Sequence, residues 1–280
     1  MPKFHVIAGA DATPAYPVVR KIGPADLKDA LAKGIEDFWT IPTSLVFLGL
    51  IYPIVGICLA GYALPLLYPL MSGFALVGPF AAVGLYEISR RLELGLETSW
   101  VNAFDVRHSR SIPSLLALGL VLLAIFICWR ATAESLYIWL FGPTEPVSYM
   151  EFLNDLFTTS RGWTLIVLGN AIGCLFAVVV LSISVISFPL LLDHDVGFAA
   201  AVLTSLRAVW ENPVTMAIWG LIVAAVLAIG FLLLFVGLAV AVPILAHASW
   251  HLYRKVVEPA APVPRQAVEL KSDPYAGSKR

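Results

Sequence analysis

Two histidines near the C-terminal end of the chain are the best candidates for chemistry. His247 and His251 are four residues apart, so both imidazoles project from one side of a helix. Imidazole binds transition metals, and one histidine from each of two helices can hold a haem. The pair lacks the glutamate of an HExxH motif and has no cysteine beside it, and histidine is common where a helix leaves a membrane. The sequence therefore assigns no metal and no cofactor, and a haem or metal-binding redox protein is the weaker alternative.

A second group of polar residues interrupts a long apolar run. Asn170, Ser182, Ser184 and Ser187 lie within it, and Asp193 follows it. A polar side chain in hydrocarbon is costly, so these residues are candidates for a solute path. Small and hydroxyl residues also mediate close helix packing and bond to their own backbone. Packing is the favoured interpretation of the group.

Motifs of the common enzyme classes are missing from the sequence. It contains no Walker loop, GxSxG elbow, dinucleotide fingerprint or HExxH. We therefore predict no catalytic residue, and the sequence favours a protein that is not an enzyme.

The composition explains where the elements that position these residues must lie. Of 280 residues, 59% are hydrophobic and 13% are charged, whereas a soluble domain has roughly 25% charged residues. This excludes a soluble globule, a disordered chain and a disulfide-rich secreted scaffold, and it leaves a multi-pass membrane protein. A net charge of −1 gives no reason to expect nucleic acid as a partner. Cys58, Cys128 and Cys174 each lie in an apolar run.

Uncharged runs long enough to cross a bilayer predict an all-α protein with six transmembrane helices. With this count, 16 of the 18 Lys and Arg residues lie on one side, and only Arg130 and Arg161 lie on the other. Under the positive-inside rule both termini are therefore cytoplasmic. The predicted spans are about 43–62, 66–88, 112–130, 164–191, 213–231 and 235–254.

The spans form three hairpins that resemble one another. An amphipathic stretch precedes each hairpin and leads to Pro42, Pro113 or Pro213, which predicts three interfacial helices on the cytoplasmic leaflet. An external insertion over 131–162, with a short amphipathic helix, extends the middle hairpin. Residues 1–23 and 258–280 are predicted to be flexible.

Residues at the ends and in the middle of the spans have structural interpretations. The arginines are predicted to anchor their helices at lipid phosphates, with pairing to Asp37, Asp105 or Asp193 as the alternative. Prolines inside the spans predict kinks. The anchors are Arg90, Arg91 and Arg254, and the kinks are at Pro53, Pro79, Pro189 and Pro243.

Three blocks of the sequence resemble a known family. They are LVGPFAAVGLYEISRRLE (76–93), SFPLLLDHDVGFAAAV (187–202) and HASWHLYRK (247–255). They resemble an uncharacterised family of proteobacterial integral membrane proteins, a domain of unknown function that is sometimes labelled cytochrome c oxidase subunit I-like. The resemblance implies a bacterial inner membrane. The oxidase label fits poorly, because a haem-copper core needs more helical histidines than this chain has: of its five, His5, His108 and His194 lie outside the spans.

Together these observations favour a non-catalytic accessory or scaffold subunit. Its expected partners are the lipid bilayer and another integral membrane complex. The alternative is a small-solute or ion transporter with a path between the kinked even-numbered spans. A transporter needs a polar cavity that reaches the middle of the membrane, whereas a scaffold has a packed apolar centre.

Overall fold

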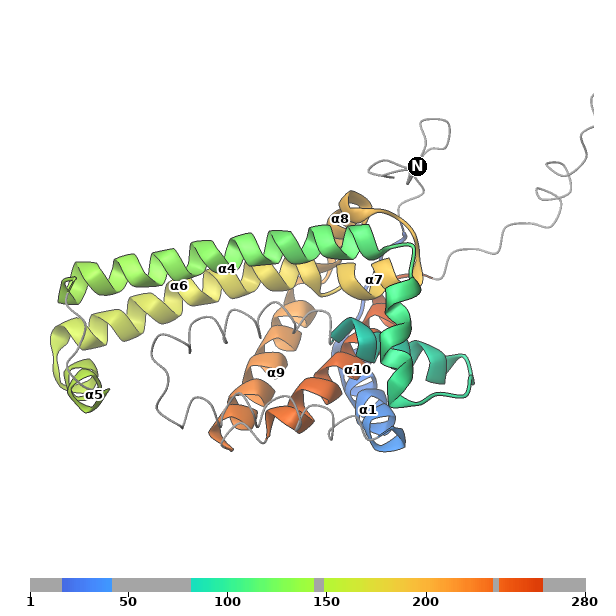
Figure 1. Ribbon diagram of the computed structural model, residues 1–280, viewed down its shortest axis with the longest axis horizontal. Helices are drawn as coiled ribbons and strands as arrows, with labels where there is room; N and C mark the ends of the chain where they lie inside the picture. Colours follow the sequence, from blue (N-terminus) through green and yellow to red (C-terminus); the bar gives the residue numbers. More distant parts are fainter. Residues whose placement is uncertain (1–16, 42–81, 144–148, 234–236, 259–280) are drawn as a thin grey trace, which may run out of the picture.

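The structure is a computed structural model that describes residues 17–41, 82–143, 149–233 and 237–258. In these residues the secondary structure is helical, apart from one antiparallel bridge between Val19 and Val257. This confirms the predicted all-helical class. The helices in Figure 1 are, in chain order, α1 (Pro24–Thr40), a helix over residues 82–93, the 3-10 helix η1 (Trp100–His108), α4 (Ile112–Phe141), α5 (Tyr149–Thr158), α6 (Ser160–Ser184), α7 (Ser187–Asp193), α8 (Phe198–Glu211), α9 (Pro213–Leu232) and α10 (Leu238–Val256).

The two longest helices, α4 and α6, lie side by side and form what we call the arm (Figure 1). Gly173 of α6 leaves room for the indole of Trp129 of α4, because a Cβ at position 173 would lie 3.2 Å from it. At the far end of the arm, α5 packs Phe152 against Tyr137 and Phe141. Small residues in α6 therefore let the two helices approach closely.

The predicted fourth span is interrupted near its end. α6 stops at Ser184, and α7 begins at Ser187. Pro189 has no N–H to donate to the carbonyl of Val185, four residues earlier, and its ring crowds that carbonyl. Pro243 lies inside α10, whereas Pro53 and Pro79 lie outside the described residues.

At the other end of the molecule, α1 packs along α10. Pro24 opens α1 with a favourable φ, and Asp26 accepts a hydrogen bond of 2.9 Å from the Gly23 N–H. The face of α1 that meets α10 is closely packed, with Gly34 against Ala248. The helix over residues 82–93 adds its own apolar side chains to this core. The buried residues of α1 are Leu27, Ala30, Gly34, Asp37 and Phe38.

Three segments among the described residues are long and apolar enough to cross a membrane. They are Ile112–Phe141, Ser160–Asp193 and Pro213–Gly230. The six predicted spans are therefore not confirmed as a set. Residues 43–62 and 66–81 lie outside the described part of the chain. The predicted span 235–254 falls mostly in α10, which is not one of the three because its last turns carry ionisable side chains.

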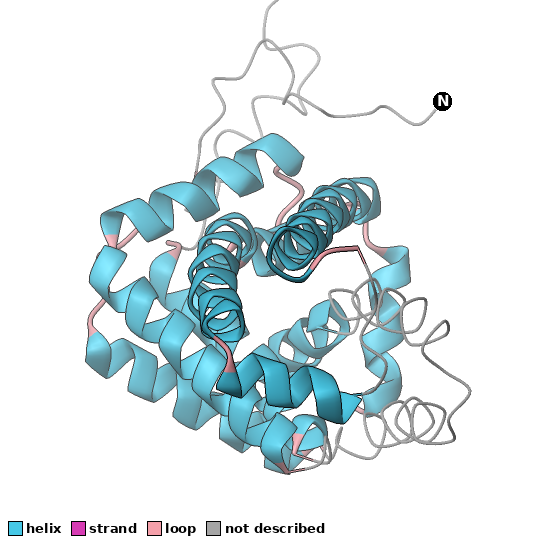
Figure 2. Ribbon diagram, turned by 90° about the vertical axis from the view of Figure 1, so that its left-hand side faces the viewer, coloured by secondary structure: helices cyan, strands magenta, loops and turns pink. Residues whose placement is uncertain are grey.

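The predicted arrangement of three equivalent hairpins is not confirmed either. Figure 1 shows α9 and α10 slanted relative to the arm instead of parallel to it, and Figure 2 looks along the arm, so that its two helices are seen end-on. The three stretches predicted as surface helices are nevertheless helical, as α1, η1 and α8.

The chain segments that flank the predicted membrane domain meet each other. The Arg20 N–H donates to the carbonyl of Val256 at 2.7 Å, and the Glu258 N–H donates to that of Val18 at 3.0 Å. Asn212 accepts the Ile22 N–H at 2.8 Å. Residues 18–22, inside the segment predicted to be flexible, are therefore hydrogen-bonded to Asn212, which lies between α8 and α9, to Thr215 of α9 and to Val256 of α10.

Candidate functional site

A buried polar cluster joins α1, the helix over residues 82–93 and α10. Ser89 Oγ donates a hydrogen bond of 2.5 Å to Asp37 Oδ2. Asp37 Oδ2 also lies 2.8 Å from His251 Nε2. His247 Nδ1 lies 2.7 Å from Ser89 Oγ. We call these four residues the polar cluster. Ser89 and His247 are fully buried and Asp37 is nearly so, so the cluster is part of the core.

The hydrogen bonds fix where the protons of the polar cluster lie. Because Ser89 donates its only proton to Asp37, the proton between Ser89 and His247 belongs to Nδ1 of His247. His251 likewise donates from Nε2 to the Asp37 carboxylate. Asp37 therefore receives hydrogen bonds from two side chains on two other helices, which is a strong arrangement for a buried carboxylate.

One nitrogen of the polar cluster is left over. His247 Nε2 is buried and has no hydrogen-bond partner among the described residues. In the neutral ring this atom is a bare acceptor, whereas a protonated ring would bury both a charge and an unpaired N–H. The environment therefore favours a neutral His247.

The polar cluster has the residue types of a hydrolase triad without its geometry. A serine nucleophile must reach a substrate, but Ser89 is fully buried and its Oγ is bonded to two other side chains. No group of three or more His, Cys, Asp or Glu residues in the described part of the chain is arranged to hold a metal ion. The cluster binds three helices to one another.

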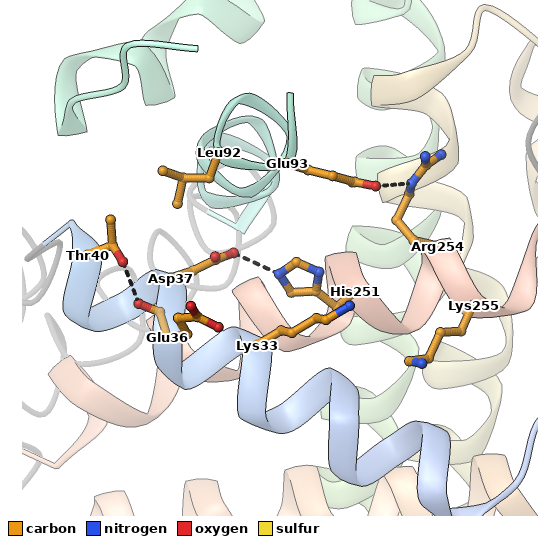
Figure 3. Close-up of a pocket in the computed structure, with 9 residues that line it drawn as sticks. All are labelled: Lys33, Glu36, Asp37, Thr40, Leu92, Glu93, His251, Arg254 and Lys255. Carbon is orange, nitrogen blue, oxygen red and sulfur yellow. Dashed lines mark hydrogen bonds and ion pairs between the residues drawn. The ribbon is translucent and has the colours of Figure 1, made fainter. Parts of the chain in front are cut away.

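An open hollow of about 560 Å³ lies beside the polar cluster, as Figure 3 shows. Two of its basic side chains, Arg254 and Lys255, already form ion pairs within the protein. Arg254 Nε lies 3.0 Å from Glu93 Oε1, and Lys255 Nζ lies 2.9 Å from Asp29 Oδ2. The hollow therefore has a balanced charge and no preference for an anion. Its lining residues are Lys33, Glu36, Asp37, Thr40, Leu92, Glu93, His251, Arg254 and Lys255.

Ion pairs at the end of α10 fasten the start of α1. Lys255 also lies 3.3 Å from Asp26. The hydrogen bond to Asp29 raises the pKa of Lys255 above its usual value, and the backbone N–H of Gly23 lowers the pKa of Asp26. Both residues are therefore charged at neutral pH, so the pair is intact there.

The arginines predicted as lipid anchors all form ion pairs in the structure. Arg90 binds Glu87 through two hydrogen bonds of 2.8 and 3.0 Å. Arg91 pairs with Asp105, and Arg254 pairs with Asp193, both at 3.3 Å. Asp105 and Asp193 were the alternative partners considered from the sequence, while anchoring to lipid stays a prediction.

The residues predicted as a polar path do not form one group. Asn170 donates to the Ile166 carbonyl of its own helix, and Ser182 and Ser184 do the same four residues back. Ser187 bonds to the carbonyls of Ile183 and Ala201, between α7 and α8. Asp193, the last residue of α7, accepts a hydrogen bond of 2.8 Å from the Tyr253 hydroxyl of α10.

Sequence reasoning placed His247 and His251 on one side of a helix but missed their partners. Asp37 carried a usable signal, because it follows Ala30 and Gly34 at helical spacing and so falls on the buried face of α1. A carboxylate on an apolar face calls for a partner. Ser89 and Trp250, which donates to Glu93 at 3.0 Å, carried no comparable signal.

Residues 67–193 match the model of a family described as "Predicted integral membrane protein (DUF2189)". The matched stretch runs from before the helix over residues 82–93 to the end of α7, and it contains Ser89 but none of the other three residues of the polar cluster. No curated protein and no solved structure matches the chain. The resemblance to integral membrane proteins of unknown function is thus confirmed for these residues.

Proposed function

We propose that this integral membrane protein is a non-catalytic accessory or scaffold subunit of the bacterial inner membrane that docks against another integral membrane complex. The surface of the arm is the observation that carries the proposal. Only 11% of the most apolar stretch of α4 is buried inside the protein. Both helices of the arm, α4 and α6, expose large apolar side chains. An apolar surface of this kind is typical of contact with lipid or with another helix. Examples are Leu120, Ile127 and Trp139 on α4, and Val167, Leu175 and Val179 on α6.

The polar residues of α6 support a scaffold better than a transporter. Asn170, Ser182 and Ser184 use their hydrogen bonds on their own backbone, as packing residues do. Asp193, the acidic residue of the predicted path, is engaged by Tyr253 and Arg254 instead. Because each of these side chains already forms a hydrogen bond or ion pair within the protein, we rank transport second.

We propose an even number of crossings, six in total, with both termini in the cytoplasm. The bridge between Val19 and Val257 supports this topology, because it brings the segments before the first predicted span and after the last one together. Three candidate spans in the described residues make an odd number, so at least one further crossing is required. The 16-to-2 distribution of Lys and Arg favours the cytoplasm for the shared side.

Site-specific photo-crosslinking tests the scaffold proposal. A photoreactive amino acid replaces Leu120, which is exposed on the arm, or Leu118, which is fully buried. Membranes of the native host are then irradiated. We expect one crosslinked product of defined mass from position 120 and none from position 118. Equal products from both positions, or lipid adducts alone at position 120, would contradict docking to a membrane complex.

Cysteine labelling separates the scaffold from the transporter. In a variant without Cys58, Cys128 and Cys174, single cysteines replace Asn170, Ser182 or Ser184. A scaffold predicts no reaction with a membrane-impermeant maleimide at these positions, while a cysteine at the exposed Arg161 reacts. Labelling at all three positions would establish a water path and overturn the ranking of the two functions.

A further inference from the structure

The segment that leads into α4 presents an apolar and basic surface. Trp100, Val101 and Phe104 of η1 are each about half exposed, and Arg107 and Arg110 follow them, both exposed. We call these five residues the η1 surface. Trp100 and Phe104 pack edge to face, with ring centroids 6.4 Å apart, so the aromatic rings form one patch.

The inner side of η1 fixes this orientation. Asp105 pairs with Arg91 at 3.3 Å and accepts from Asn102 at 2.9 Å. Ala103 contacts Gly84 so closely that a Cβ at position 84 would lie 3.0 Å from it. The polar and small residues of η1 are thus fastened to the helix over residues 82–93, which directs the η1 surface outwards.

The two arginines of the η1 surface differ from the three arginines predicted as anchors. Arg90, Arg91 and Arg254 each have a carboxylate partner. Arg107 and Arg110 have none among the described residues. Apart from Asp105, the acidic residue nearest to them in the sequence is Glu97, which precedes Trp100. Two unpaired guanidinium groups favour an anionic partner, and guanidinium binds phosphate through two parallel hydrogen bonds.

The place of the η1 surface in the chain indicates which anion it meets. α4, a candidate span, begins at Ile112, two residues after Arg110. The η1 surface therefore lies where the chain enters the apolar layer. Aromatic rings prefer this level of a membrane, and arginines there reach lipid phosphates.

We infer that the η1 surface binds anionic phospholipids of the leaflet in which α4 begins. Trp100 and Phe104 insert between the acyl chains, and Arg107 and Arg110 bind the headgroup phosphates. The inference rests on the proposed membrane topology but not on the scaffold role. Each arginine contributes about a fivefold preference for an anionic lipid over a neutral one, from about 1 kcal/mol per basic residue at a charged surface.

Quenching by spin-labelled lipids tests the inference on the full-length protein. A fluorophore is attached to a cysteine at position 104, or at position 101 as a second probe, in the variant without native cysteines. The protein is placed in nanodiscs of phosphatidylcholine that contain either spin-labelled phosphatidylglycerol or spin-labelled phosphatidylcholine. We expect stronger quenching by the anionic lipid. If the two arginines act independently, an R107Q/R110Q double variant should reduce the preference for the anionic lipid about 25-fold.

A matched control and the other outcomes complete the test. R20Q/R207Q removes two exposed arginines outside the η1 surface and should keep the preference. Equal quenching by both lipids in the protein with all its arginines would overturn anionic selectivity. No quenching by either lipid, at either probe, would overturn lipid docking altogether and indicate a protein occupant. Failure of the crosslinking experiment on the arm would leave these results unchanged, so the two proposals fail separately.

Discussion

Gly34 of α1 and Ala248 of α10 are in such close contact that a side chain at position 34 would not fit. A Cβ at position 34 would lie 2.5 Å from the backbone nitrogen of Ala248 and 2.7 Å from its Cβ. Asp37 lies one turn further along α1 and reaches His251 of α10. The close approach at Gly34 therefore determines whether the polar cluster can form.

We predict that G34A lowers the free energy of unfolding by about 1–3 kcal/mol, the usual effect of overpacking a tight interface. The added methyl group meets backbone atoms of α10, which cannot turn away as a flexible side chain would. Thermal unfolding of the purified protein in mild detergent measures the effect. G23A is the control, because nothing lies within 4 Å of a Cβ at position 23. Equal stability of the two variants would contradict the close contact.

Removal of the carboxylate at the centre of the polar cluster should destabilise the protein. D37A leaves Ser89 and His251 without their acceptor, and each buried polar group without a partner costs about 1–3 kcal/mol. E36A, one position earlier on the exposed side of α1, should have little effect. Thermal unfolding in mild detergent again measures the effect. Equal stability of D37A and E36A would argue against a structural role of Asp37.

A double-mutant cycle tests whether Asp37 and Ser89 act together. S89A removes the hydroxyl that D37A leaves unpaired, so the double variant should lose less stability than the sum of the two single variants. Residues within one hydrogen-bond network couple by about 0.5–3 kcal/mol. Additive effects would show that the hydrogen bond of 2.5 Å contributes nothing to stability.

The sequence predicted the apolar helices well and their partners poorly. Long uncharged runs were sufficient to locate the three candidate spans, which overlap the predicted spans 112–130, 164–191 and 213–231, because length and hydropathy are local properties. The run in α10 was also apolar, yet much of α10 is buried inside the protein. Apolar length alone does not distinguish a helix buried in protein from one that crosses a membrane.

The candidate site shows the same division. The spacing of His247 and His251 was enough to place both imidazoles on one side of a helix. It gave no information about Asp37, which is 214 residues from His251 in sequence. Periodicity identifies which side of α1 is buried, but the helix that covers it is chosen by tertiary packing. The hydrogen bonds of Asn170, Ser182 and Ser184 are local instead, because each joins a side chain to a carbonyl four residues earlier in the same helix.

The arm offers a prediction about helix packing in the membrane. G173L places a large side chain where Gly173 meets the Trp129 indole, and a Cβ there would already lie 3.2 Å from the ring. We expect α4 and α6 to separate locally, with a loss of stability of about 1–3 kcal/mol. G169L is the matched control, because a Cβ at position 169 would meet only Leu136, at 3.9 Å. Protease resistance of the arm in detergent should fall in G173L alone, and unchanged resistance would argue against this packing.

The ion pairs of Lys255 predict how stability depends on pH. The pKa of Asp26 is lowered from 3.8, mainly by the Gly23 N–H, so its stabilising effect is complete above pH 3.8 and is lost as the pH falls further. The pKa of Lys255 is raised from 10.5, mainly by its hydrogen bond to Asp29, so its stabilising effect is complete below pH 10.5 and is lost at higher pH.

The stability difference between the protein and K255M should therefore be constant between pH 3.8 and pH 10.5 and should shrink outside these limits. At low pH the carboxylates of Asp26 and Asp29 become neutral, and at high pH Lys255 does. Unfolding measured across this range tests the prediction. K28M is the control, because Lys28 is exposed on the same end of α1. Its stability difference from the unchanged protein should not shrink outside these limits. A difference for K255M that grows towards low pH would mean that Lys255 stabilises the protein by a contact other than these two carboxylates.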